Sequence, residues 1–219
     1  MRTPPLLAVV VLASTWAMSG CGSGYQYIKN DDVGVYAKVP AGWTVYGDAE
    51  LHPGANERDL ERMAQVRWIR SFYGGDDGQS VEASLTPNSP VPTGQVVIQA
   101  IPPQIREVLD LRTMRGGGNP NADPVTLEQQ GGSPTTGEAY HVLTDDSVTM
   151  ADGYSGLHTV YAVAGPDGIY VVDQIVLRSP DSTRMVLFTV GCAEECYADT
   201  YKDEIKTLVD SWTIQEVQS

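Results

Sequence analysis

Basic residues are scarce in this chain of 219 residues, which has 14 lysines and arginines against 28 aspartates and glutamates and a formal net charge of −14. A surface of this charge repels phosphates, so nucleic acid is excluded as a partner. The same charge disfavours flat docking of the protein on an anionic membrane. We expect the excess of acid mainly to keep the protein in solution.

The common catalytic and metal-binding motifs are also absent. The histidines, His52, His141 and His158, are far apart, and no two have the spacing of a zinc site. Gly153-Tyr154-Ser155-Gly156 resembles the start of a nucleophile elbow, but Leu157 stands where a second glycine is required. We therefore expect no catalytic residues, no cofactor and no metal site. A hydrolase assembled by folding, with His141 or His158 beside an acid and a serine, stays open.

Long hydrophobic runs are missing except near the start, where Leu6–Met18 is almost wholly apolar and follows Arg2. This run is shorter than the roughly 20 residues that span a bilayer as a helix, and it is typical of a secretory signal. Met18-Ser19-Gly20-Cys21 resembles the lipobox of bacterial lipoproteins. The resemblance implies that residues 1–20 are a signal peptide, that lipid is attached to Cys21, and that the protein lies on the extracytoplasmic face of the cell membrane.

Cleavage before Cys21 would remove one arginine and no acid, which changes the net charge from −14 to −15. Residues 21–32 are then expected to form a lipidated cysteine and a short flexible tether, because Gly22-Ser23-Gly24 is typical of flexible linkers. Residues 33–219 show no internal linker, so they are expected to form a single domain.

The chain has only three cysteines, and lipidation of Cys21 leaves Cys192 and Cys196. A disulfide is the expected state of two nearby cysteines outside the cytoplasm. A redox pair and a pair of metal ligands are the alternatives. The three residues between the two cysteines differ from the C-x-x-C spacing of redox sites, and no histidine is near in sequence.

The apolar pattern after residue 33 predicts an α+β fold in which an antiparallel sheet is flanked by helices. Strands are expected at 33–39, 43–46, 65–73, 81–85, 95–101, 125–129, 140–143, 155–163, 169–177 and 185–190. Short turns join the last three strands, which predicts a meander. Helices are expected at 55–63, 103–115 and 199–212. In the second helix, Ile105, Val108 and Leu109 are expected to share one apolar face.

Two segments resemble the PsbP-like family. Val39-Pro40-Ala41-Gly42-Trp43 is similar to the P-x-G-W opening of these domains, and Val209-Asp210-Ser211-Trp212 is similar to their closing helix. The resemblance implies an α/β/α sandwich around an antiparallel sheet, which serves mainly as a binding and assembly module. Ten arginines against four lysines fit the GC-rich genomes of actinobacteria, in which PsbP-like lipoproteins occur. Residues 74–137 match nothing in the family.

Tyrosine is abundant, with eleven residues against two phenylalanines. Tyrosines lining one exposed face would make a protein-binding or glycan-binding surface, whereas tyrosines at the margin of a core would be structural. Asn119, Asn121 and Asp123 alternate as calcium ligands do, but Pro124 and Gln130 stand where a calcium loop has glycine and glutamate. We interpret this segment as a surface loop.

The sequence therefore favours a non-enzymatic binding module of the cell envelope. Its expected partners are the lipid bilayer, through Cys21, and an envelope protein or another envelope component. A carrier of a hydrophobic ligand such as a lipid is the first alternative, and it requires a large apolar cavity. A small envelope hydrolase is the second.

Overall fold

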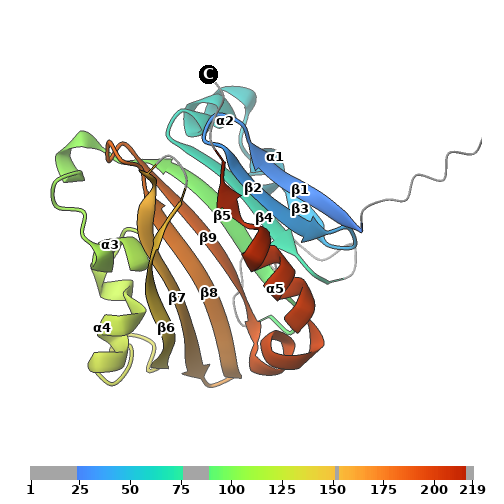
Figure 1. The fold of residues 1–219 in the computed structure, drawn as a ribbon, viewed down its shortest axis with the longest axis vertical. Coiled ribbons are helices and arrows are strands. Elements are labelled where there is room, and N and C mark those ends of the chain that lie inside the picture. Colours follow the sequence, from blue (N-terminus) through green and yellow to red (C-terminus); the bar gives the residue numbers. More distant parts are fainter. Residues whose placement is uncertain (1–23, 76–88, 151–152, 216–219) are drawn as a thin grey trace, which may run out of the picture.

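The computed structural model describes residues 24–75, 89–150 and 153–215. Cys21 and the strand expected at 81–85 lie outside these residues. Within the described ranges, ten strands and several short helices form three layers, of which a large antiparallel sheet is the middle one (Figure 1).

The large sheet has seven strands in the order β3-β4-β5-β9-β8-β7-β6, and every neighbouring pair is antiparallel. Its strands are β3 (Thr44–Tyr46), β4 (Arg67–Tyr73), β5 (Thr93–Ala100), β6 (Ala139–Thr149), β7 (Ser155–Gly165), β8 (Gly168–Arg178) and β9 (Arg184–Ala193). The four last strands follow one another across the sheet, which confirms the meander. Short connections leave consecutive strands no other way to pair.

A small sheet and the C-terminal helix cover one face of the large sheet. The small sheet has the order β1-β2-β10, from β1 (Tyr25–Asn30), β2 (Val35–Pro40) and β10 (Thr213–Ile214). The helix is α5 (Lys202–Ser211), which follows a π-helical turn at Cys196–Thr200. On the opposite face lie α3 (Leu111–Arg115) and α4 (Pro124–Gln129), each after a short 3₁₀ turn, at Pro103–Ile105 and Pro120–Ala122. Two further helices, α1 (Asp48–Leu51) and α2 (Glu57–Ala64), join β3 to β4.

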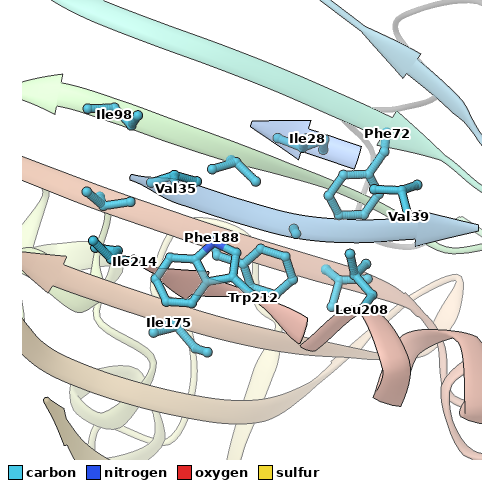
Figure 2. Packing of buried hydrophobic residues seen from close by; sticks show 14 of the residues in the cluster. Ile28, Val35, Val39, Phe72, Ile98, Ile175, Phe188, Leu208, Trp212 and Ile214 are labelled. Atoms are coloured by element: carbon cyan, nitrogen blue, oxygen red, sulfur yellow. The ribbon is translucent and has the colours of Figure 1, made fainter. Parts of the chain in front are cut away.

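The main core fills the space between the large sheet and the layer of β1, β2 and α5 (Figure 2). Phe188 of β9 packs against Trp212 with ring centroids 5.6 Å apart, and Leu208 of α5 is fully buried beside them. Full burial of an apolar side chain of this size contributes roughly 1.5–3 kcal/mol. The apolar stripe of the C-terminal helix therefore faces the sheet, as the sequence predicts.

A smaller apolar cluster fills the opposite face, where Leu109 and Met114 pack against Leu157, Val176 and Met185. Side chains alternate between the two faces along each strand. On β9, Phe188 and Val190 consequently enter the main core, while Thr189 and Gly191 point to the side of α3 and α4.

Three expectations about local structure are wrong. Residues 25–30, expected in the flexible tether, form β1, because Ile28 is buried in the main core and all six residues pair with β2. Residues 103–115 do not form one helix. The side chain of Asp110 accepts a hydrogen bond from the Thr113 amide, so Asp110 is the N-cap of a separate helix, α3. Val108, which precedes this cap, is 71% exposed.

Residues 125–129, expected as a strand, belong to α4. Asp123 caps this helix by accepting a hydrogen bond from the Thr126 amide, and Pro124 occupies its first position. An acid at the N-cap followed by proline is a helix start signal, and here it outweighs the β-propensity of Val125 and Thr126.

Candidate functional site

The candidate site lies on the face of the large sheet that carries α3 and α4. The strand register places a row of polar residues across this face, one from each of six neighbouring strands: Ser71, Gln95, Thr189, Gln174, Thr159 and Asp145. A continuous polar row is unusual for a sheet face that is covered by helices, because buried polar groups are costly without partners.

A pocket with a volume of about 360 Å³ opens beside this row, and Gln95 and Thr189 of the row belong to its lining. It is lined by Thr93, Gly94, Gln95, Gly116, Ala122, Tyr140, Tyr161, Val163, Tyr170, Val172, Thr189, Val190 and Gly191. None of these lining residues is charged. The pocket thus combines aromatic rings with neutral hydroxyl and amide groups, which is the general character of a small-molecule site.

Three tyrosines from consecutive strands form one wall of the pocket. The rings of Tyr140 and Tyr161 stack with centroids 6.2 Å apart, and the Tyr170 hydroxyl donates to Oε1 of Glu138 over 3.4 Å. Burial raises the pKa of Tyr161, and burial together with the nearby Glu138 raises that of Tyr170. The Tyr161 phenol is therefore protonated at neutral pH and can donate a hydrogen bond to a ligand, whereas the Tyr170 hydroxyl already donates to Glu138.

Thr189, which belongs to the lining of the pocket, carries an unpaired hydroxyl. Its Oγ1 atom is buried and has no hydrogen-bond partner among the described residues. A buried polar atom without a partner costs about 1–3 kcal/mol, so such atoms are rare unless a ligand or water bonds to them. The neighbouring Thr93 differs, because its hydroxyl donates to the Gly191 carbonyl.

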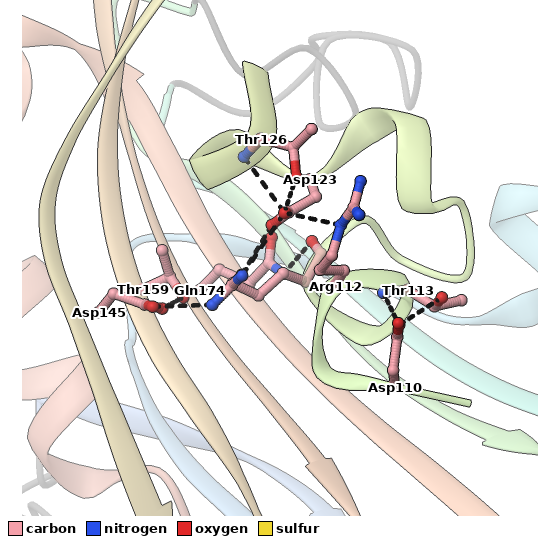
Figure 3. Close-up of polar contacts among 9 residues, drawn as sticks. Asp110, Arg112, Thr113, Asp123, Thr126, Asp145, Thr159 and Gln174 are labelled. Atoms are coloured by element: carbon pink, nitrogen blue, oxygen red, sulfur yellow. Dashed lines mark hydrogen bonds and ion pairs between the residues drawn. The ribbon is translucent and has the colours of Figure 1, made fainter. Parts of the chain in front are cut away.

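An ion-pair network holds α3 and α4 against the sheet beside the pocket (Figure 3). Nε of Arg115 donates to Oδ1 of Asp123 over 2.7 Å, and Nη1 donates to Oδ2 of Asp145 on β6 over the same distance. The Gln174 amide donates to the Arg115 carbonyl over 2.7 Å. Burial opposes ionisation of Asp123, but hydrogen bonds from Arg115 and Thr126 outweigh it and lower the pKa of this carboxyl. The network fixes the end of α3, where Gly116 enters the pocket wall.

Gly116 allows the chain to fold back tightly at this point. A Cβ atom on Gly116 would lie 1.8 Å from the Asn119 carbonyl oxygen, which is far closer than any real contact. The close approach keeps the turn at Pro120–Ala122 against α3 and places Ala122 in the pocket wall.

Asp123, a candidate calcium ligand in the sequence, belongs to this ion-pair network instead. Asp123 is fully buried and paired with Arg115, while the Asn119 side chain accepts from the Asn121 amide within its own turn. A guanidinium therefore occupies the position where a cation would bind to Asp123.

The histidines stay apart in the fold. His52 follows α1, and Nδ1 of His141 on β6 lies 2.8 Å from Oε1 of Glu128. His158 on β7 lies with Nε2 2.7 Å from Oδ1 of the buried Asp173. Across the described ranges, no group of three or more His, Cys, Asp or Glu residues could hold a metal ion.

His158 and Asp173 lie on the main-core face of the sheet, away from the pocket. The Tyr197 hydroxyl donates to Oδ2 of Asp173 over 3.0 Å, so the carboxylate lies between the imidazole and the phenol. In a nucleophilic triad the histidine lies between the nucleophile and the acid. The arrangement differs from that relay, and the hydrogen bond to Asp173 raises the pKa of His158.

Cys192 at the end of β9 and Cys196 at the start of the π-helical turn form the expected disulfide. Both cysteines are buried in the main core. The bridge thus fixes how the chain leaves the sheet towards α5, and the redox-pair and metal-ligand alternatives are not supported.

The pocket tyrosines were not singled out by sequence reasoning, which left open whether tyrosines line an exposed face or the margin of a core. Their signal was present, since Tyr140, Tyr161 and Tyr170 all fall in or beside expected strands. The missing information was the register, which decides whether tyrosines on three strands meet.

Among the described residues, no helix has the length and apolar character needed to cross a bilayer. No family model matches the sequence, and no curated protein matches it.

Solved structures give distant similarities over most of the chain. The solution structure of cyanobacterial PsbP (CyanoP) from Synechocystis sp. PCC 6803 is 16% identical, covers 90% of this chain and 96% of its own, and has a TM-score of 0.47. The Saccharomyces cerevisiae Ran-binding protein Mog1p is 11% identical, covers 87% and 95%, and has a TM-score of 0.41. The sheet order and the two covering layers described above show an α+β sandwich in one domain, as expected.

Proposed function

We propose that this protein is a non-enzymatic binding module of the cell envelope, anchored to the extracytoplasmic face of the membrane through Cys21, and that its pocket binds the saccharide part of an envelope component. The observation that carries the ligand class is the lining of the pocket, which combines stacked tyrosine rings with uncharged hydroxyl and amide groups.

Saccharides match this lining in two ways. Their ring faces are apolar and pack on aromatic side chains, while their hydroxyls both donate and accept hydrogen bonds. Tyr161 and Thr189 contribute hydroxyl-bearing side chains to the lining, and Gln95 contributes an amide. The volume of about 360 Å³ suits a short saccharide, since it lies at the lower end of the range of small-molecule sites.

A hydrophobic ligand fits less well. An acyl chain in this pocket would leave the hydroxyls of Tyr161 and Thr189 without partners, at a cost of about 1–3 kcal/mol each. The interior between the large sheet and α5 is filled by the packed aromatic and aliphatic side chains of the main core. The hydrolase alternative is weaker still, because the His158–Asp173 pair lies on the other face of the sheet from the pocket.

The anchor is supported by the leader sequence and by the disulfide. Cys192 and Cys196 bond to each other, which leaves Cys21 as the remaining cysteine for acylation. Mass spectrometry of the N-terminal peptide from the full chain, produced in a bacterial host, tests this part of the proposal directly. A diacylglyceryl mass on Cys21 is expected, and an uncleaved or unmodified N-terminus would contradict it.

The ligand class is tested by titrating the full chain in detergent with a panel of neutral mono- and disaccharides and N-acetylated sugars, using calorimetry. Tyr161→Phe and Thr189→Val should each weaken binding by about fivefold or more, since each removes one hydrogen bond worth roughly 1 kcal/mol. Tyr197→Phe, which removes a phenol hydroxyl on the opposite face, is the matched control and should bind normally. Binding of palmitate with no binding of any sugar would favour the lipid carrier, and turnover of the bound sugar would favour the hydrolase.

A further inference from the structure

We propose that the outer face of β1 and β2 is a membrane-contact surface that lies on anionic phospholipid headgroups. This inference rests on the proposed anchor at Cys21 but not on the pocket or its ligand. It concerns a face of the small sheet that points away from the main core.

The side chains of this face are tyrosines and lysines. Ile28, Val35, Ala37 and Val39 point into the core, so the alternate residues of both strands point outward. Five of them form the surface, here called the Tyr-Lys face: Tyr25, Tyr27, Lys29, Tyr36 and Lys38. Two of the four lysines in the whole chain lie on it.

The residues of the Tyr-Lys face contact one another across the two strands. Nζ of Lys29 lies 5.3 Å from the centroid of the Tyr27 ring and 5.7 Å from that of Tyr36. The rings of Tyr27 and Tyr36 are 5.4 Å apart. Tyr25 and Tyr27 are nevertheless 38% and 44% exposed, so aromatic area remains for a partner.

Distance and charge both select the lipid surface as that partner. Tyr25 follows Cys21 by four residues, which span at most about 14 Å. An acylated Cys21 would therefore hold the start of β1 at the headgroup layer. Tyrosine rings favour the membrane–water interface, and lysines are attracted to anionic leaflets. In a protein with a net charge of −14, a face with two lysines and three tyrosines and no acid departs from the acidic character of the chain.

Neither β1 nor β2 contains an aspartate or glutamate. Asp31 and Asp32 follow β1 in the turn to β2, while the anchor precedes Tyr25 at the other end of the strand. The two acidic residues of the turn therefore lie at the end of the hairpin opposite to the one that follows Cys21. The overall negative charge disfavours flat docking of the whole molecule, but it leaves this one surface suited to a bilayer.

Amine labelling tests the contact between the Tyr-Lys face and the membrane, and two lysines on α5 serve as internal references. The acylated full chain is transferred to preformed vesicles of phosphatidylcholine, with or without an equal part of phosphatidylglycerol, and treated with a membrane-impermeant acetylating reagent. Labelling of Lys29 and Lys38 is compared by mass spectrometry with that of Lys202 and Lys206, which are exposed on α5. On anionic vesicles the ratio of Lys29 to Lys206 labelling should fall about fivefold relative to detergent. It should recover in high salt.

Two variants of equal charge change sharpen the test. Lys29→Glu should abolish the protection of Lys38, whereas Lys206→Glu should leave the protection of Lys29 intact. If the acylated protein stays on the vesicles while Lys29 is labelled as in detergent, the anchor stands and the membrane-contact surface is wrong. If Lys29 is protected only in intact cells, a partner other than lipid covers the face, and this also overturns the proposal. An N-terminus without acyl groups would remove the anchor and the inference together.

Discussion

Nε of Arg115 lies 2.7 Å from Oδ1 of Asp123, and the Asp123 side chain is fully buried while that of Arg115 is only 10% exposed. Removing one partner of such a pair leaves an uncompensated charge in the interior. Arg115→Ala should therefore lower the free energy of unfolding by about 3 kcal/mol, as measured by urea denaturation. The control is Arg112→Ala: Arg112 is 52% exposed and 3.8 Å from Asp123, and its loss should cost less than about 1 kcal/mol. Equal effects of the two variants would contradict this account.

The His158–Asp173 pair predicts a dependence of stability on pH. The hydrogen bond to Asp173 raises the pKa of His158 above its ordinary 6.5, and the carboxylate of Asp146 on the facing strand acts in the same direction. The pair therefore stabilises the fold fully below pH 6.5 and loses this contribution as the pH rises through the raised pKa. Melting temperatures should fall across this window, and His158→Gln should flatten the profile.

Tyr197→Phe is the control for that experiment. It removes the other hydrogen bond to Asp173 but keeps the titrating imidazole. The slope with pH should survive in this variant. A slope that persists in His158→Gln would assign the pH dependence to another group.

We expect the hydroxyl of Thr189 to lower the stability of the fold and to contribute to ligand binding. Its Oγ1 atom is buried without a partner, so Thr189→Val should raise the free energy of unfolding by about 1 kcal/mol while weakening saccharide binding. Thr159→Val is the matched change in the same polar row, and it should destabilise by a similar amount, because the Thr159 hydroxyl donates to Asp145 over 2.8 Å. A loss of stability in Thr189→Val would indicate that its hydroxyl has a partner in solution.

The disulfide should make a modest contribution to the free energy of unfolding. Cys192 and Cys196 are four positions apart in the sequence, and closing so short a loop in the unfolded chain is worth about 2 kcal/mol. The double variant Cys192→Ala and Cys196→Ala should unfold at lower urea concentration by that amount, plus a small packing loss in the core. Reducing agent should have no effect on this variant, whereas it should destabilise the unmodified protein.

The meander, the closing helix and the disulfide could be predicted from the sequence because local signals decide each of them. Short turns force neighbouring strands to pair, and the stripe of Ile205, Leu208 and Trp212 has helical spacing. The prediction of one helix at 103–115 was wrong. It rested on the helical spacing of apolar residues, but Val108, which is one of these residues, is exposed and not packed in a core. The pocket could not be predicted, since it depends on register between strands that are far apart in sequence: Thr93 lies opposite Gly191, which lies opposite Val172 and then Tyr161.

The pairing of β1 has a mechanical consequence. Tyr25 pairs with Pro40 at the open end of the β1–β2 hairpin, and the connecting turn lies at the other end. A force applied through the residues before Tyr25 would therefore break the pairs one after another, starting from Tyr25, instead of shearing them all together. Peeling off the six residues of β1 would release about 20 Å of chain before tension reached the seven-stranded sheet. Under such a load β1 is thus the first part of the fold to yield, and the sheet that forms the pocket yields last.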